Sequence, residues 1–186
     1  MMQYADQPDV LIRPFESKDQ KAVTELFKEV NRRLAPKQMA HAFEDYIARS
    51  IKGEVGDITS YYDGRKAWFY VATLAQDIIG MFGLEKIDAD TVELRRMYVA
   101  PALRGKGLGR KLLVFTEQAA QSKDFARLIL STSELQPEAL NLYRKSGFTE
   151  IGIEKDPTPT NKALGGGIAR VHFKKLLATS QQPLTR

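Results

Sequence analysis

The chain has 186 residues, of which 43% are hydrophobic and 27% charged, so it is long enough for one well-packed globular domain. It contains no cysteine, which excludes disulfides, thiolate metal ligands and acyl-cysteine intermediates, and its two histidines leave little scope for a zinc site. The net charge of +5 is too small and too scattered for a nucleic-acid-binding face, and no apolar stretch approaches the ~20 residues that span a membrane.

The first third of the chain predicts one strand and two helices. Apolar residues at 10–14 indicate the strand, and Ser17 is expected to cap a helix with apolar residues at helical spacing. A break over 31–37 separates this helix from a second one at about 43–51. Residues 53–65 include three glycines and are expected to form a loop.

The rest of the chain alternates between strand and helix patterns. Strands are expected at 67–74, 77–87, 91–99, 127–132, 148–154 and 169–176, and helices at 107–121 and 137–146. Residues 9–177 are expected to form a single domain between disordered tails at 1–8 and 178–186. This alternation predicts a mixed α/β (α+β) fold, in which helices flank one sheet.

The strand expected at 91–99 contains a change of phase. Its apolar residues occupy even positions before Arg95 and odd positions after Arg96. A strict period of two cannot hold this pattern, whereas a β-bulge would restore one apolar face. The alternative is an edge strand with two exposed arginines.

A glycine-rich turn follows this strand and opens the next helix. The first N–H groups of a helix lack partners within the helix and carry partial positive charge, and glycines let a ligand approach the backbone closely. The turn therefore predicts a cradle for a diphosphate. We assign to it the run Arg104, Gly105, Lys106, Gly107, Leu108, Gly109 and Arg110.

Two common nucleotide motifs do not fit this turn. A nucleoside triphosphate P-loop ends in Gly-Lys-Ser/Thr, whereas here Gly105-Lys106 is followed by Gly107. A dinucleotide fingerprint needs Gly-x-Gly-x-x-Gly, and the glycines at 105, 107 and 109 have a different spacing.

Two motifs resemble those of the GNAT N-acyltransferase superfamily, and together they cover about residues 91–149. Arg104, Gly107 and Gly109 match its coenzyme A signature, Arg-x-x-Gly-x-Gly. The second motif, Asn-x-x-Ala-x-x-Leu-Tyr-x-x-x-Gly-Phe, is matched by Ala139, Leu142, Tyr143, Gly147 and Phe148. Its first position departs from the family, because Gln136 replaces the asparagine.

The resemblance implies a specific architecture and cosubstrate. The fold would have three αβα layers, with a twisted, mostly antiparallel sheet of about seven strands whose fourth and fifth strands are parallel and splayed apart. In this family a bulge on the fourth strand opens a slot for the pantetheine arm of acetyl-CoA, and no metal is needed. Besides 104–110, we expect cofactor contacts from Met97, Tyr98, Val99, Gln136, Ala139 and Tyr143.

Acyl transfer from a thioester to an amine needs a neutral amine and a proton for the departing thiolate. A free primary amine is mostly protonated at neutral pH, so a carboxylate that draws off its proton helps. Glu93 is our candidate for this base; alternatively, it faces solvent or pairs with Arg95. The resemblance assigns Tyr143 as the general acid; alternatively, Tyr143 is a core aromatic residue.

The function implied is transfer of an acetyl group from acetyl-CoA to a primary amine, by direct attack in a ternary complex and on a small-molecule acceptor. The alternatives are a non-catalytic acyl-CoA-binding or regulatory module, or an acetyltransferase acting on protein lysines or N-termini. In the family, the acceptor pocket would involve residues 31–38 and 155–169.

We expect no nucleic-acid or membrane partner, and a homodimer is left open. The first residues have neither the basic region nor the apolar region of a secretory signal, which favours a cytoplasmic protein.

Overall fold

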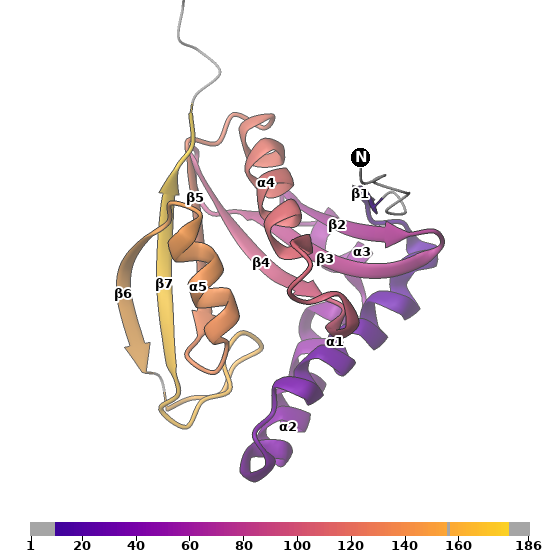
Figure 1. Ribbon diagram of the computed structural model, residues 1–186, viewed down its shortest axis with the longest axis vertical. Coiled ribbons are helices and arrows are strands. Elements are labelled where there is room, and N and C mark those ends of the chain that lie inside the picture. The colour runs from indigo at the N-terminus through magenta and orange to yellow at the C-terminus, as the bar shows by residue number, and fades with distance from the viewer. Residues whose placement is uncertain (1–9, 156, 179–186) are drawn as a thin grey trace, which may run out of the picture.

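One seven-stranded sheet organises the part of the chain that the computed structural model describes, residues 10–155 and 157–178 (Figure 1). Its strand order is β1-β2-β3-β4-β5-β7-β6, and all neighbours are antiparallel except β4 and β5. The strands are β1 (Val10–Pro14), β2 (Ala67–Leu74), β3 (Asp77–Lys86), β4 (Thr91–Val99), β5 (Arg127–Ser133), β6 (Thr149–Lys155) and β7 (Ala169–Leu176). The predicted fold, with its parallel fourth and fifth strands, is confirmed.

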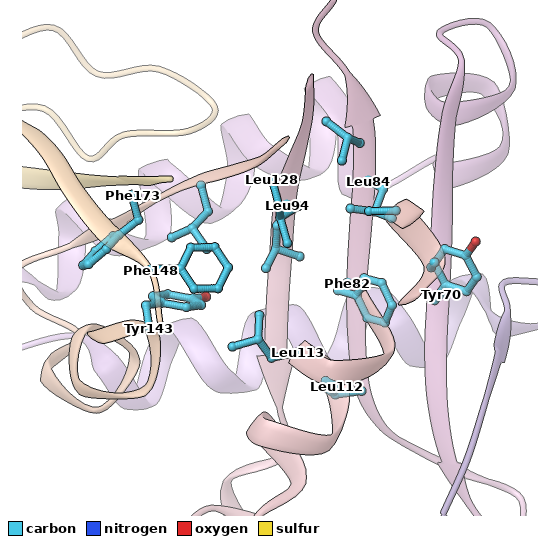
Figure 2. Close-up of a cluster of buried hydrophobic side chains, with 14 of the residues drawn as sticks. Tyr70, Phe82, Leu84, Leu94, Leu112, Leu113, Leu128, Tyr143, Phe148 and Phe173 are labelled. Carbon is cyan, nitrogen blue, oxygen red and sulfur yellow. The ribbon is translucent and has the colours of Figure 1, made fainter. Parts of the chain in front are cut away.

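Helices cover both faces of this sheet. They are α1 (Gln20–Leu34), α2 (Ala40–Ser50), α3 (Ile58–Asp63), α4 (Leu108–Gln121) and α5 (Pro137–Lys145). Helices α4 and α5 lie on one face, where an apolar cluster around Phe82, Leu112 and Tyr143 packs (Figures 1 and 2). Helices α1, α2 and α3 cover the opposite face, where a second cluster includes Phe27 and Met81. Consecutive residues of β3 serve the two clusters, as the pleat of a strand requires.

Two expectations about the first third of the chain are wrong. Ser17 does not cap α1: it begins a 3₁₀ turn (Ser17–Asp19), in which the Asp19 carboxylate accepts the N–H of Glu16 at 2.9 Å, and α1 starts at Gln20. The expected loop at 53–65 instead contains a π-helical turn (Ile51–Val55) and α3, whose N-cap is Asp57. Elements this short leave almost no periodic pattern, and their three glycines suggested a loop.

The predicted β-bulge is present in β4. Gly83 of β3 lies opposite Arg95 and Met81 lies opposite Tyr98, so two residues of β4 face one residue of β3. Arg96, in the bulge, has a left-handed φ of 52°. The edge-strand alternative is wrong, because β4 is central in the sheet and both arginines are less than 10% exposed.

Strands β4 and β5 separate soon after they begin (Figure 1). They pair only from Thr91 opposite Arg127 to Glu93 opposite Ile129, although β4 continues to Val99 and β5 to Ser133. The predicted splay is therefore present. Beyond Glu93, the side of β4 that faces β5 has no strand partner in the described part of the chain, and this opening contains the candidate site.

The expected tails at 1–8 and 179–186 lie outside the described residues. Ala178, the first residue of the expected C-terminal tail, accepts a hydrogen bond from the Gln121 side chain at 3.0 Å.

Candidate active site

A cleft of about 650 Å³ lies between the end of β4, the glycine-rich turn and α5. Most of the predicted cofactor residues line it, namely Met97, Tyr98, Val99, Arg104, Gly105, Gly107, Gly109, Arg110, Gln136 and Ala139. Lys106, Leu108 and Tyr143 do not. The side chain of Leu108 packs into the core, so only its backbone N–H is available to a ligand.

The glycine-rich turn presents a run of free backbone donors to this cleft. Within the described ranges, none of the N–H groups of residues 105–110 has a hydrogen-bond acceptor. Gly105 and Gly107 have φ values of 73° and 81°, a backbone conformation that side chains rarely adopt, and a Cβ at either position would meet no atom within 4 Å. These donors, the N-terminus of α4 and the nearby Arg104 and Arg110 fit the diphosphate of coenzyme A.

A smaller cavity of about 100 Å³ adjoins the cleft. The two share Leu34, Met97, Tyr98 and Gln136 as lining residues. The cavity extends from the bulge of β4 to the end of β5 and the segment 157–168, and it contains both predicted catalytic residues, Glu93 and Tyr143.

Tyr143 lies on α5 against the core (Figure 2). Its ring meets those of Phe148 and Phe173 with centroid separations of 5.7 Å each. No hydrogen-bond partner of its hydroxyl is found among the described residues, and burial raises its pKa well above that of a free tyrosine. The hydroxyl therefore keeps its proton at neutral pH, on a residue that lines the cavity.

Glu93 is held by a partner that the sequence did not suggest. Its carboxylate accepts from the ammonium of Lys162 at 2.7 Å, while the nearest guanidinium nitrogen of Arg95 is 4.0 Å away. The Glu93 side chain is 14% exposed and lines the cavity. A carboxylate is therefore present where an acceptor amine could reach it, under the side chain of a loop residue.

Glu54 holds the two arginines at the bulge of β4. This glutamate of the π-helical turn is 2% exposed, and its carboxylate accepts from Arg95 at 2.6 Å, Arg96 at 2.8 Å and the Tyr62 hydroxyl at 2.8 Å. Burial alone would raise the pKa of Glu54, but the two positive charges and the hydrogen bonds outweigh it, so its pKa is lowered. Arg95 also pairs with Glu85.

Sequence reasoning missed Glu54, although a signal existed. Two arginines on a central strand must find carboxylates, because an unpaired buried charge is very costly. Assigning 53–65 to a loop removed the glutamate from consideration.

The segment 157–168 closes one side of the cavity. The carbonyl of Asn161 accepts from Arg96 at 2.8 Å and from the Ser50 hydroxyl at 3.0 Å, which attaches this segment to β4 and α2. Both regions expected to form the acceptor pocket border the cavity, 31–38 through Asn31 and Leu34, and 155–169 through Lys162 and others.

Neither a metal centre nor a membrane helix is found in residues 10–155 and 157–178. These residues contain no group of three or more histidines, aspartates or glutamates that could hold a metal ion, and no helix long and apolar enough to cross a bilayer.

Comparison with known proteins gives matches in sequence and in fold. A family profile described as an acetyltransferase (GNAT) domain matches residues 65–150. N-acetylaspartate synthetase of Danio rerio is 32% identical over 119 residues, which cover 61% of this chain and 41% of that protein. The chain spans about half the length, or less, of curated relatives such as this one.

Solved structures match over nearly the whole chain. A GNAT-family acetyltransferase from Staphylococcus aureus Mu50 gives a TM-score of 0.72 at 20% identity, covering 91% of this chain and all of that one. PaiA N-acetyltransferase from Thermoplasma acidophilum, solved with coenzyme A, gives 0.67 at 20% identity, covering 90% and 99%. The profile match includes the bulged strand, the glycine-rich turn and the tyrosine helix, and the chain is similar in sequence and in fold to acetyltransferases of the GNAT superfamily.

Proposed function

We propose that this protein transfers an acetyl group from acetyl-CoA to the primary amine of a small molecule, by direct attack in a ternary complex. The observation that carries the proposal is the junction of two spaces: a cleft lined by free N–H donors and a cavity with a carboxylate and a protonated phenol. The first suits an anionic carrier, and the second supplies the acid and base that amide formation needs.

In the cleft, the N–H groups of 105–110, together with Arg104 and Arg110, would hold the diphosphate. The β5-facing side of β4 at Met97 to Val99 would pair with the amides of the pantetheine arm, because no described strand pairs with β4 on that side beyond Glu93. Bound acetyl-CoA supplies the acyl group as a thioester. That a structural neighbour, PaiA, was solved with coenzyme A supports this assignment.

In the cavity, Glu93 would accept the proton that the acceptor ammonium must lose before it can attack. The ammonium of Lys162 forms an ion pair with this carboxylate, so the ammonium of the acceptor would replace that of the lysine. Tyr143 would donate its proton to the departing sulfur. Its raised pKa keeps that proton in place over the physiological range, and its burial removes competing water.

The size of the cavity favours a small acceptor. About 100 Å³, closed on one side by 157–168, admits a compact molecule without rearrangement, whereas a protein segment would have to displace this loop. The names of similar proteins include both kinds of acceptor: an N-acetylaspartate synthetase and a ribosomal-protein-S18-alanine N-acetyltransferase.

Calorimetric titration with acetyl-CoA and ATP, followed by a thiol-release screen against small amines, tests the proposal. We expect micromolar binding of acetyl-CoA, no binding of ATP, and thiol release with at least one class of amine. Binding without release from any amine would favour a non-catalytic acyl-CoA module or a protein acceptor. If acetyl-CoA did not bind, the assignment of the cleft would be wrong.

A further inference from the structure

The cavity carries more positive charge than its own carboxylates neutralise. Its lining includes four cations, Arg95, Arg96, Lys162 and Arg170. Three carboxylates pair with them: Glu54 with both Arg95 and Arg96, Glu85 with Arg95, and Glu93 with Lys162. One positive charge is left over.

That charge belongs to Arg170, on β7. Its guanidinium donates to the carbonyl of Lys162 at 2.6 Å and to the carbonyl and hydroxyl oxygens of Ser131 at 3.1 and 2.8 Å. Within the described ranges, no carboxylate lies within ion-pairing distance of it. Neutral oxygens orient the side chain, and no carboxylate among the described residues neutralises its charge.

Arg96 provides a second, independent sign of a missing partner. It is 9% exposed and lines the cavity, yet its buried Nε has no hydrogen-bond acceptor among residues 10–155 and 157–178. Its Nη1 donates to the Tyr46 hydroxyl at 2.8 Å, and its Nη2 to Glu54 and Asn161. A buried donor without an acceptor is costly, and a ligand oxygen would remove that cost.

The two arginines bind consecutive carbonyls of the segment 157–168: Arg96 donates to that of Asn161 and Arg170 to that of Lys162. Burial would raise the pKa of Tyr46, but the positive charges of Arg96 and Arg170 contribute to lowering it. The oxygen of the Tyr46 hydroxyl accepts a hydrogen bond from Arg96. One part of the cavity therefore offers two guanidinium groups and a phenol, and another offers the Glu93 carboxylate.

We propose that the acceptor is an amine that also carries a carboxylate, as an amino acid does, with its ammonium at Glu93 and its carboxylate between Arg96 and Arg170. The inference rests on the proposed acetyl transfer and specifies its substrate class. The ammonium of the substrate replaces that of Lys162. The carboxylate of the substrate neutralises the remaining positive charge, and its oxygens accept hydrogen bonds from the guanidinium groups with matching geometry. A protein lysine or N-terminus lacks this carboxylate and is excluded as a preferred acceptor.

Matched sets of amines test the inference. Thiol release from acetyl-CoA is measured with the common L-amino acids, with their amides, and with the corresponding decarboxylated amines. We expect at least one amino acid to exceed its amide and its decarboxylated amine by about 100-fold in kcat/KM, because the latter two leave the arginines unpaired. Equal or faster turnover of the uncharged analogues would overturn the inference while leaving acetyl transfer intact.

Two further outcomes distinguish a failure of this inference from a failure of the proposed acetyl transfer. Binding of acetyl-CoA without acetylation of any carboxylate-bearing amine contradicts the substrate class. Failure to bind acetyl-CoA contradicts the proposed function itself, and the inference with it.

Replacing Arg170 locates the carboxylate subsite. Arg170→Gln removes the unpaired charge and leaves the pairs of Glu54 intact, so the fold is expected to persist. We expect KM for the preferred amino acid to rise about 10- to 100-fold, with unchanged KM for its amide and for acetyl-CoA. Lys174→Gln, on the same strand but exposed and outside the cavity, is the matched control for loss of charge. An equal rise for the amino acid and its amide in Arg170→Gln would refute the subsite.

Discussion

The cleft and the cavity are built in different ways, although they share a wall. The cleft relies on backbone groups from one continuous stretch, the N–H donors of 105–110, together with the free side of β4. The cavity relies on side chains from α1, α2, β4, β5, α5, β7 and the segment 157–168. A backbone site tolerates changes of side chain except where glycine is required, whereas a side-chain site changes whenever its residues change. This difference suits a constant cosubstrate beside a variable acceptor.

The largest effect should come from the charge cluster that supports the cavity. Glu54→Ala leaves Arg95 and Arg96 buried with less compensation, and removing one partner of a buried pair costs about 3–5 kcal/mol of unfolding free energy. Urea denaturation measures this loss. As a control, Glu44→Ala breaks the exposed pair with Arg32 and should leave the unfolding free energy nearly unchanged. Similar costs for the two variants would show that the cluster does not support the bulge.

The same cluster predicts a pH dependence. The pKa of Glu54 is lower in the folded protein than in the unfolded chain, so its contribution to stability is present above the unfolded pKa of about 4.5. The contribution is lost as the pH falls through the lower, folded value. The unfolding free energy of the parent protein should therefore decrease more steeply in acid than that of Glu54→Ala, as denaturation at several pH values between 3 and 6 would measure.

The next effect concerns the cleft alone. Gly107→Val introduces a β-branched side chain at a φ of 81° and strains the turn by roughly 1–2 kcal/mol. We expect at least a ~100-fold loss of acetyl-CoA affinity by calorimetry, with the fold retained. Gly152→Val is the control, because Gly152 has no positive φ and a Cβ there meets no atom within 4 Å. Unchanged affinity in Gly107→Val would reject the turn as the diphosphate site.

The glycine-rich turn and the Glu54 cluster differ in how far they could be predicted from the sequence. The glycine-rich turn, the bulge and the tyrosine helix each depend on neighbours close in sequence, so spacing and phase predicted them. Glu54 could not be found in the same way, since it meets Arg96 from 42 residues away through a π-helical turn without a periodic pattern. Arg170 is similar: its place in the cavity depends on the pairing of β7 with β5, at the opening left by β4.

Tyr143→Phe examines the chemistry of the cavity. The substitution removes only a hydroxyl that has no partner in the described part of the chain, so stability should change little. A general acid contributes about 10²-fold or more, and kcat should fall accordingly, with acetyl-CoA affinity unchanged. Because the pKa of Tyr143 is raised, the ratio of kcat in the parent protein to kcat in Tyr143→Phe should stay constant from pH 6 to 9 in stopped-time assays. An unchanged kcat would leave Tyr143 as a core aromatic residue.

The smallest effect should come from replacing Lys162. This variant tests whether the Lys162 side chain can leave the Glu93 carboxylate without a loss of stability. Its side chain is 42% exposed, and its pair with Glu93 should contribute less than about 1 kcal/mol to stability. Lys162→Ala frees the carboxylate, so KM for the acceptor should fall a few-fold while acetyl-CoA binding is unchanged. Lys155→Ala, exposed at the end of β6, controls for the loss of an exposed lysine. A large fall in kcat for Lys162→Ala would instead show that the lysine takes part in catalysis. The acceptor ammonium would then not replace Lys162 at Glu93.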